Sequence, residues 1–482
     1  MENSSPTQTQ RGELVPQPYA FEPPPKPPIM APSNATSPPI GGESTLSFKL
    51  SQCFGDCSPA EEVTEADILS AVEFDSTGEY LATGDKGGRV VIFKQNSARK
   101  QKVSASGKVR QASDYKFFTE FQSHEQEFDY LKSLEIEEKI NQIKWCSKTH
   151  NSLMLLSTND KTVKLWKVQE KKVAKVSTMG MHAYSNMPKA SRRLRMPVVD
   201  VEGTTVTAQP RRIFSNAHAY HVNSIDPNVD GEHFMSVDDL RMNLWNLEVT
   251  DKSFNIVDIK PKNMEELTEV ITSACFHPTQ CNVFMYSSSR GSIKIGDMRA
   301  SALCDVQAKV LYEGTDSSSK SFFSEIVASI SDIKCTSDGR YIVSRDYMTL
   351  KMWDVNMERR PLKTIHVHDQ LRGQLCDLYE NDCIFDKFEC AVSGNATHVM
   401  SGTYGSACQL YDRFGNKQCT LEVSKDPSKR GKKSKRKGAA GGPAPHTPLD
   451  YEKKILHLSW HPQDDIIAVA GLNKLYIYTA QR

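Results

Sequence analysis

The chain of 482 residues carries 60 Lys and Arg against 59 Asp and Glu, so it lacks the overall positive field of a dedicated nucleic-acid binder. Its 12 cysteines are scattered without a CxxC pair, which argues against a zinc site and favours reduced thiols in a cytosolic or nuclear protein. No apolar stretch approaches the ~20 residues that cross a bilayer, so we expect a protein of the cytoplasm or nucleus with no membrane partner.

Residues 1–43 hold proline clusters among Ser, Thr and Asn, including Pro23, Pro24 and Pro25. This composition buries too little apolar surface to offset the entropy of ordering the chain, so we expect a disordered tail. Proline clusters can dock on SH3-like or WW-like grooves, but a plain spacer is the commoner role of such a tail.

From residue 47 onward, one unit of three short strands recurs seven times. In its first copy, an apolar strand at Ala71–Phe74 is followed by a second strand at Tyr80–Gly84 and a third at Arg89–Phe93. Most copies close on an aromatic residue, and the fifth closes on the signature pair Trp353-Asp354. The seven closing positions are Phe93, Trp166, Trp245, Gly296, Trp353, Tyr411 and Tyr478.

These repeats predict an all-β, seven-bladed WD40 β-propeller over residues 44–482. The closing positions are farther apart than the roughly 40–45 residues of an uninterrupted WD40 repeat, so the blades carry loop insertions. No single repeat buries its apolar faces alone, and the ring must therefore close. The seventh copy has no room for a fourth strand, and we expect Ser47–Gln52 to supply that outer strand and cover the edge.

No motif for catalysis or metal binding is present, since the chain has no GxSxG, HExxH or GxxxxGK[ST]. Gly87-Gly88 resembles part of a phosphate loop, but it lies between two strands with no helix behind it, so we expect a hairpin turn. We therefore expect no enzyme activity, no cofactor and no metal.

Four histidines are interpreted as structural. His277 and His461 each precede a proline at the same position of a repeat, which favours a turn over a ligand role. His218 and His221 are expected to make hydrogen bonds within the blades.

Three aspartates, Asp160, Asp239 and Asp346, precede the third strand of a blade, where Asp caps a turn by accepting from backbone amides. A capping role does not account for Asp238-Asp239 together with the acidic stretch Met264–Glu269. Turns and insertions of a propeller can gather on one face, so we expect these acidic residues to lie close together. A patch of carboxylates there would attract basic peptides.

Two insertions differ in character. Residues 117–139 are rich in both aromatics and acids, so we expect a projecting arm that binds a partner, although part of it must be the outer strand of blade 1. Residues 425–448 contain the basic run Lys429–Lys437, and we expect a disordered loop. The sharper alternatives for this loop are a nuclear-import signal or transient phosphate contacts.

Eight longer strings resemble one family of WD40 proteins. They are GDKGGRVVIF (84–93), FQSHEQEFDYLKSLEIEEKIN (121–141), LLSTNDKTVKLWK (155–167), FNIVDIKP (254–261), NMEELTEVIT (263–272), RASALCD (299–305), SFFSEI (321–326) and LYENDCIFDKFEC (378–390). Together they resemble the B-type WD40 regulatory subunits of protein phosphatase 2A. The likeness extends from about residue 60 to the end of the chain, with departures near 170–208 and near 430.

The resemblance implies a non-catalytic subunit of a trimer, with an α-helical repeat scaffold subunit and a metal-dependent catalytic subunit as partners. It also implies that an acidic face receives phosphoprotein substrates with basic motifs. The substrate-binding residues of the family match Glu65, Lys86, Asp239, Glu265 and Leu267. The family's scaffold-binding residues correspond less directly to positions of this chain. They match Phe128 and Tyr130 in the arm, and Arg211 and Arg212.

Two other classes of function stay open from the residues alone. The chain could be a WD40 adaptor in another assembly, such as a ubiquitin ligase or a chromatin complex. It could also bind nucleic acid through the basic insertion, and such binding would have a steep salt dependence and disappear when the insertion is deleted. We do not expect nucleic acid as a partner.

Overall fold

Seven antiparallel sheets of four strands follow one another along the chain in a computed structural model of the protein. The structure describes residues 46–55, 63–96, 102–103, 109–110, 114–130, 132–147, 152–177, 198–314, 321–423 and 451–481. The predicted tail 1–43 and the predicted basic insertion 425–448 lie outside the described residues.

Each sheet is one blade, whose four strands run in order from the inner to the outer edge. Blade 1 consists of β2 (Leu69–Phe74), β3 (Tyr80–Asp85), β4 (Arg89–Gln95) and β7 (Tyr115–Gln122), and blade 2 of β10 (Gln142–Trp145), β11 (Leu153–Thr158), β12 (Val163–Ser177) and β13 (Val198–Phe214). Blade 3 consists of β14 (Ser224–Pro227), β15 (His233–Val237), β16 (Arg241–Asn246) and β17 (Val249–Asp258), and blade 4 of β18 (Ile271–Phe276), β19 (Val283–Ser288), β20 (Ile293–Asp297) and β21 (Lys309–Leu311).

Blades 5 to 7 continue in the same way. Blade 5 consists of β22 (Ile330–Cys335), β23 (Tyr341–Asp346), β24 (Thr349–Asp354) and β25 (Lys363–His366), and blade 6 of β26 (Cys390–Val392), β27 (His398–Thr403), β28 (Ala407–Asp412) and β29 (Lys417–Glu422). Blade 7 consists of β30 (Leu458–Trp460), β31 (Ile466–Gly471), β32 (Lys474–Gln481) and β1 (Ser47–Phe54). The inner strands contact one another in chain order, and β30 of blade 7 contacts β2 of blade 1. The blades therefore form the closed seven-bladed β-propeller that the repeats predicted.

The ring is closed by a strand from the beginning of the described chain. β1 pairs antiparallel with β32, from Ser47 opposite Gln481 to Phe54 opposite Leu475, with one bulge after Leu50. Phe48 packs edge-on against Trp460 of β30, with ring centroids 5.8 Å apart. This segment thus occupies the outer position of blade 7 that was predicted for it, and it buries an edge that would otherwise be unpaired.

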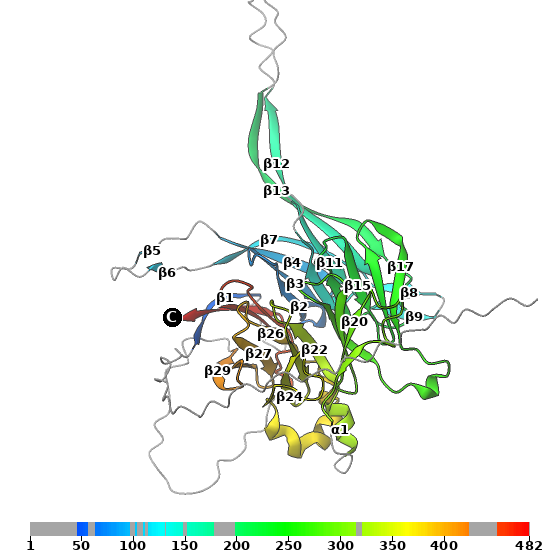
Figure 1. Ribbon diagram of the computed structural model, residues 1–482. Helices are drawn as coiled ribbons and strands as arrows, with labels where there is room; N and C mark the ends of the chain where they lie inside the picture. Colours follow the sequence, from blue (N-terminus) through cyan, green and yellow to red (C-terminus); the bar gives the residue numbers. More distant parts are fainter. Residues whose placement is uncertain are drawn as a thin grey trace, which may run out of the picture. The chain divides into compact units, whose positions relative to one another are not determined.

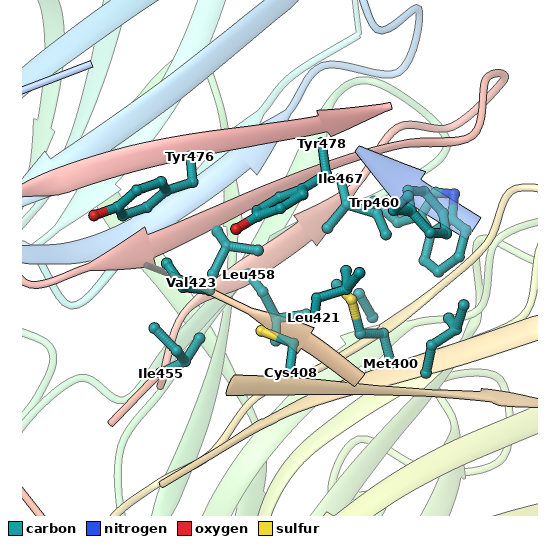
Figure 2. Packing of buried hydrophobic residues seen from close by; sticks show 14 residues of the cluster. Met400, Cys408, Leu421, Val423, Ile455, Leu458, Trp460, Ile467, Tyr476 and Tyr478 are labelled. Atoms are coloured by element: carbon teal, nitrogen blue, oxygen red, sulfur yellow. The ribbon is translucent and has the colours of Figure 1, made fainter. Parts of the chain in front are cut away.

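The core lies between the blades, because middle strands such as β3 and β31 are buried on both faces. Figure 2 shows the packing between blades 6 and 7, where Met400 and Cys408 of blade 6 belong to one buried cluster with Tyr478 of blade 7. A similar cluster between blades 1 and 2 joins Ile92 to Leu155. Neighbouring blades thus supply the apolar surface that no blade can bury by itself.

Antiparallel strands put the connections of the propeller on two opposite faces. One face holds the turns between second and third strands and the connections from each outer strand to the next inner strand. It carries α1, so we call it the α1 face. Its short elements are η2 (Glu65–Asp67), β8 (Glu127–Asp129), β9 (Leu134–Ile136), η6 (Met264–Glu266), α1 (Phe322–Val327), η8 (Asp369–Gln374), α2 (Leu375–Glu380) and η9 (Cys383–Phe385).

The opposite face holds the connections between third and fourth strands, including β5 (Lys102–Val103) and β6 (Val109–Arg110). The most prominent of these is the hairpin of β12 and β13, whose pairing continues outward to Ser177 opposite Val198. In Figure 1 this hairpin projects from the blades on the side opposite α1. We call this side the hairpin face.

Capped turns recur on the α1 face, one residue earlier than predicted in two blades. Asp346 accepts from the backbone N of Met348 and Thr349, as expected. In blades 2 and 3, however, the caps are Asn159 and Asp238. The predictions that Asp160 and Asp239 cap these turns are therefore wrong, and both side chains are left for other contacts.

The histidines mostly take structural positions. The Nε2 of His277 lies 3.0 Å from the carbonyl oxygen of Gly339 in the next blade, and His461 accepts from the backbone N of Gln463 and Asp464. His218 is buried between Asp238 and Ser236, with Nδ1 2.9 Å from the carboxylate and Nε2 2.5 Å from the hydroxyl.

His221 is the exception, because its side chain is 71% exposed and lies 2.8 Å from Asp160. It is a surface residue of the α1 face and not part of a blade's internal hydrogen bonding.

Candidate functional site

All five residues predicted to bind substrate lie on the α1 face. Glu65 belongs to η2 before blade 1, and Lys86 lies in the turn between β3 and β4. Asp239 lies in the turn between β15 and β16 of blade 3, whereas Glu265 and Leu267 lie in and after η6, between blades 3 and 4. The topology thus brings residues from distant parts of the sequence to one face, in two groups.

The first group is an ion pair on blade 1. The Nζ of Lys86 lies 2.8 Å from Oε1 of Glu65, whose side chain is 80% exposed. The hydrogen bond and charge of Lys86 lower the pKa of the Glu65 carboxyl. Asp67 and Asp85 share Arg89 beside this pair. Opposite charges are therefore largely matched within this group.

The second group centres on two adjacent aspartates with different environments. Asp238 is fully buried, caps the turn through Leu240 and Arg241, and contacts His218. Asp239 is half-buried, and its backbone carbonyl accepts from the N of Ile271 at 2.8 Å. Among the described residues, no Lys, Arg or His lies within ion-pair distance of its carboxylate.

Burial raises the pKa of the Asp239 carboxyl, and the charges of Lys387 and His221 oppose this rise. The carboxylate is thus partly removed from water without a direct cationic partner, which is an environment that a positive ligand group would improve. Asp160 holds the equivalent position in blade 2, but its carboxylate already contacts His221 and Asn141. Asp239 is therefore the better placed of these two turn carboxylates to bind a cationic ligand.

The short helix η6 places more acids beside Asp239. Asn263 caps it by accepting from the backbone N of Glu265 at 3.2 Å, and Glu265 and Glu266 are exposed. Leu267 is half-buried beside them. Because Ile271 at the end of this connection bonds to Asp239, the two segments are joined. We call Asp239, Glu265, Glu266 and Leu267 the acidic patch.

Two features of the α1 face were not found from the sequence. Lys387 is near enough for its charge to act on Asp239. Aromatic side chains from α1 and the α2 to η9 segment also form one exposed cluster, in which Phe322 and Tyr379 have ring centroids 5.8 Å apart and Phe385 lies 5.9 Å from Tyr379. The aromatic residues of this cluster stand in the strings SFFSEI and LYENDCIFDKFEC. Nothing in either string, however, indicates that the two insertions contact each other.

The residues predicted to bind the scaffold do not come together. Phe128 and Tyr130 lie at the β8–β9 hairpin on the α1 face, 44% and 86% exposed, with ring centroids 5.1 Å apart. Arg211 and Arg212 lie on β13, where both guanidinium groups contact Glu248 in blade 3 at 2.6 and 3.2 Å. The two pairs occupy different parts of the molecule.

Arg211 helps to line a pocket of about 640 Å³ between blades 2 and 3. The turns around it belong to the hairpin face. Its lining residues are Cys146, Ser147, Ser152, Met154, Leu165, Lys167, Gln169, Glu170, Arg211, Gly231, Glu232, Asn246, Leu247 and Glu248. The pocket lies at the base of the projecting hairpin of β12 and β13.

The projecting arm was predicted at residues 117–139, but most of its first part is β7, the outer strand of blade 1. The longest projection in the described chain is the β12–β13 hairpin, in which Lys171, Lys172 and Lys175 are exposed. From the sequence, this region stood out only as a departure from the family pattern.

Among the described residues, no group of three His, Cys, Asp or Glu side chains is arranged to hold a metal ion. Within the same residues, no helix has the length and apolar character needed to cross a membrane.

Searches against models of protein families found no match. The chain is, however, 52% identical over 467 residues to the B regulatory subunit of protein phosphatase PP2A from Schizosaccharomyces pombe, covering 91% of this chain and 98% of that protein. The chain belongs to this family. It is also 49% identical to the serine/threonine-protein phosphatase 2A regulatory subunit phr2AB of Dictyostelium discoideum, covering 90% of this chain and 98% of the relative.

A plant relative gives the same result. The B alpha isoform of the 55 kDa regulatory subunit of serine/threonine protein phosphatase 2A from Oryza sativa subsp. japonica is 47% identical, over 92% of this chain and 86% of that protein. The family predicted from the sequence strings is thereby confirmed. As a member of the family of B-type PP2A regulatory subunits, the chain has a regulatory role in a phosphatase complex.

Proposed function

We propose that the chain is a non-catalytic subunit that recruits phosphoprotein substrates with basic motifs to the PP2A catalytic subunit through the acidic patch. The observation that carries this proposal is the state of Asp239, a half-buried carboxylate without an ion-pair partner among the described residues. A lysine or arginine of a substrate would supply the missing charge, and exposed Glu265 and Glu266 would extend the attraction. Leu267 offers an apolar contact beside them.

Adjacent aspartates give a matched test of this proposal. A single exposed ion pair contributes ~0.2–1 kcal/mol, so Asp239→Asn should weaken binding of a lysine-rich phosphoprotein by up to about fivefold. Asp239→Lys should abolish its dephosphorylation by the reconstituted trimer, because it adds repulsion across the patch. Hydrolysis of a small phosphate ester should be unchanged, since we assign the catalytic groups to another chain.

Asp238→Ala is the structural control, because it removes a buried cap and should lower the melting temperature. Asp239→Lys should leave both the melting temperature and trimer assembly unchanged. Parallel loss of stability, assembly and substrate turnover in Asp239→Lys would exclude the recruiting role of Asp239.

We further propose that the hairpin face is where the scaffold subunit docks. The pocket of about 640 Å³ beside Arg211 and the projecting β12–β13 hairpin together offer a recess and a basic extension on one side of the molecule. Docking of the scaffold there leaves the acidic patch on the α1 face open to substrate. A location in the cytoplasm or nucleus and the absence of nucleic-acid binding stay predictions.

The projecting hairpin can be removed without touching the blade. Glu170 pairs with Val206 across the two strands, so replacing residues 171–205 by an Asn-Gly turn should keep the register of blade 2. We expect this variant to melt normally and to lose capture of the scaffold subunit in a pull-down. Normal capture of the scaffold and catalytic subunits by the variant would contradict the docking of the scaffold on the hairpin face. If the wild-type chain itself captured neither subunit, the result would favour an adaptor in another assembly.

A further inference from the structure

Two lysines from separate elements converge on one backbone oxygen of the α1 face. The Nζ of Lys132, in the turn between β8 and β9, donates to the carbonyl oxygen of Ala219 at 3.0 Å. The Nζ of Lys161, in the turn between β11 and β12, donates to the same oxygen at 2.8 Å. Ala219 lies in the connection from β13 to β14. Two ammonium groups are thus held side by side where three loops meet.

Nearby carboxylates compensate the charges of this pair only in part. Among the described residues, none lies within ion-pair distance of either ammonium group. Asp129 accepts from the backbone N of Lys132 at 3.2 Å, and Asp160 contacts His221 and Asn141. Burial, followed by the charge of Lys132, lowers the pKa of Lys161, although the charges of Asp129 and Asp160 act in the opposite direction. The arrangement therefore leaves two positive charges close together and only partly compensated.

A neutral carbonyl can accept from both lysines but cancels neither charge. If the pair served only to fasten the β8–β9 hairpin, one ammonium would satisfy this oxygen without like-charge repulsion. Each ammonium has three N–H donors, so donors remain after the bond to Ala219. A phosphate monoester carries close to two negative charges at pH 7 and offers three acceptor oxygens, which suits two adjacent ammonium groups. A carboxylate would bring only one charge.

The lysine pair is connected to the acidic patch through two residues of the α1 face. Asp160 is the chain neighbour of Lys161 in the turn between β11 and β12, and its carboxylate lies 2.8 Å from Nδ1 of His221. The charge of His221 in turn acts on Asp239. A ligand that places a basic residue at Asp239 can therefore present a neighbouring anionic group to Lys132 and Lys161.

We propose that Lys132 and Lys161 form an anion site for the phosphate group of a phosphorylated side chain in the recruited protein. This inference rests on the proposed recruiting function, to which it adds a second contact of opposite charge. Substrates that carry both a basic segment and an additional phosphate would bind more tightly than those with the basic segment alone.

The anion site can be tested without any substrate. Inorganic phosphate titrated against the full chain should show saturable line broadening in phosphorus NMR at constant ionic strength. Lys132→Met with Lys161→Met should abolish it, whereas Lys171→Met with Lys172→Met, an equal change of charge on the exposed hairpin, should not. Phosphate binding that is absent in the wild type, or equal in both double variants, would overturn the site. Lys132→Arg with Lys161→Arg keeps both positive charges and should retain phosphate binding. This variant therefore separates loss of the charges from loss of the loop structure.

The link to recruitment needs lysine-rich peptides that differ at one position, carrying serine, phosphoserine or aspartate. Charge-assisted hydrogen bonds predict about tenfold tighter binding of the phosphoserine peptide to the wild-type chain, and the Lys132/Lys161 methionine variant should lose this preference. Asp239→Lys should weaken all three peptides alike. Equal affinity for serine and phosphoserine peptides, or for aspartate and phosphoserine peptides, would refute phosphate recognition. Unchanged affinity in Asp239→Lys would instead refute the acidic patch.

Discussion

Asp238 and Asp239 show how neighbouring residues of the same type acquire different roles. The side chain of Asp238 turns inward to two backbone amides and His218, and it is completely buried. Asp239 bonds to the next blade through its carbonyl and keeps its carboxylate half-exposed. An Asp-Asp pair in a propeller turn can therefore serve stability with one residue and binding with the other.

His124 is a residue whose ionisation should make stability depend on pH. Its ring is 1% exposed between Ser123 and the carbonyl of Thr162, and burial together with the charge of Lys164 lowers its pKa from 6.5 to about 3. Protonation therefore favours the unfolded chain as pH falls below 6.5. This single group should cost ~1.4 kcal/mol of stability per pH unit down to the folded pKa.

Melting temperatures at about pH 7.5 and about pH 5 can isolate this contribution. His124→Gln should lose less stability on acidification than the wild type, even if it is less stable at the higher pH. His366→Gln, at a side chain that is 49% exposed, is the control and should keep the wild-type difference. An unchanged pH dependence in His124→Gln would contradict the argument.

At the scale of elements, the β8–β9 hairpin presents an exposed aromatic pair on the α1 face. Phe128 and Tyr130 contact each other and are too exposed to belong to a blade core. If they are anchors for a partner subunit, replacing both with Ala should weaken assembly by ~2 kcal/mol or more and should leave the melting temperature unchanged. Analytical ultracentrifugation of the reconstituted trimer would measure this. Intact assembly with a lowered melting temperature would show instead that the pair supports the fold.

At the scale of the whole molecule, ring closure depends on β1. Deleting residues 1–43 should leave folding intact, whereas deleting residues 1–58 should give insoluble protein, because β32 would keep β31 but lose its outer partner and expose an unpaired edge. Size-exclusion chromatography and circular dichroism of both deletions would decide. A soluble longer deletion that melts cooperatively would refute closure by this strand.

The fold was largely predictable because each blade repeats one apolar pattern, and the missing outer strand of the seventh copy pointed to Ser47–Gln52. The site was predictable only in part. The family resemblance named Glu65, Lys86, Asp239, Glu265 and Leu267. The structure places them in turns and connections, and the alternation of strand direction puts these on one face. The sequence could not tell which of two adjacent aspartates turns inward, since that depends on backbone geometry at the turn. It also could not show that α1 and α2 meet, because they stand before and after blade 5 in the chain and come together only when that blade folds.

The pairing of β1 with β32 has a consequence for synthesis. A ribosome releases Ser47 early and Gln481 more than four hundred residues later, yet these two residues must end opposite each other. Until then the nascent chain carries two unpaired edges, one at each end of an incomplete ring. Contacts of such long sequence separation form slowly, and exposed edges aggregate in the meantime. Production of this protein should therefore be limited by the time between the emergence of its first strand and its last, and slower translation would prolong that exposure.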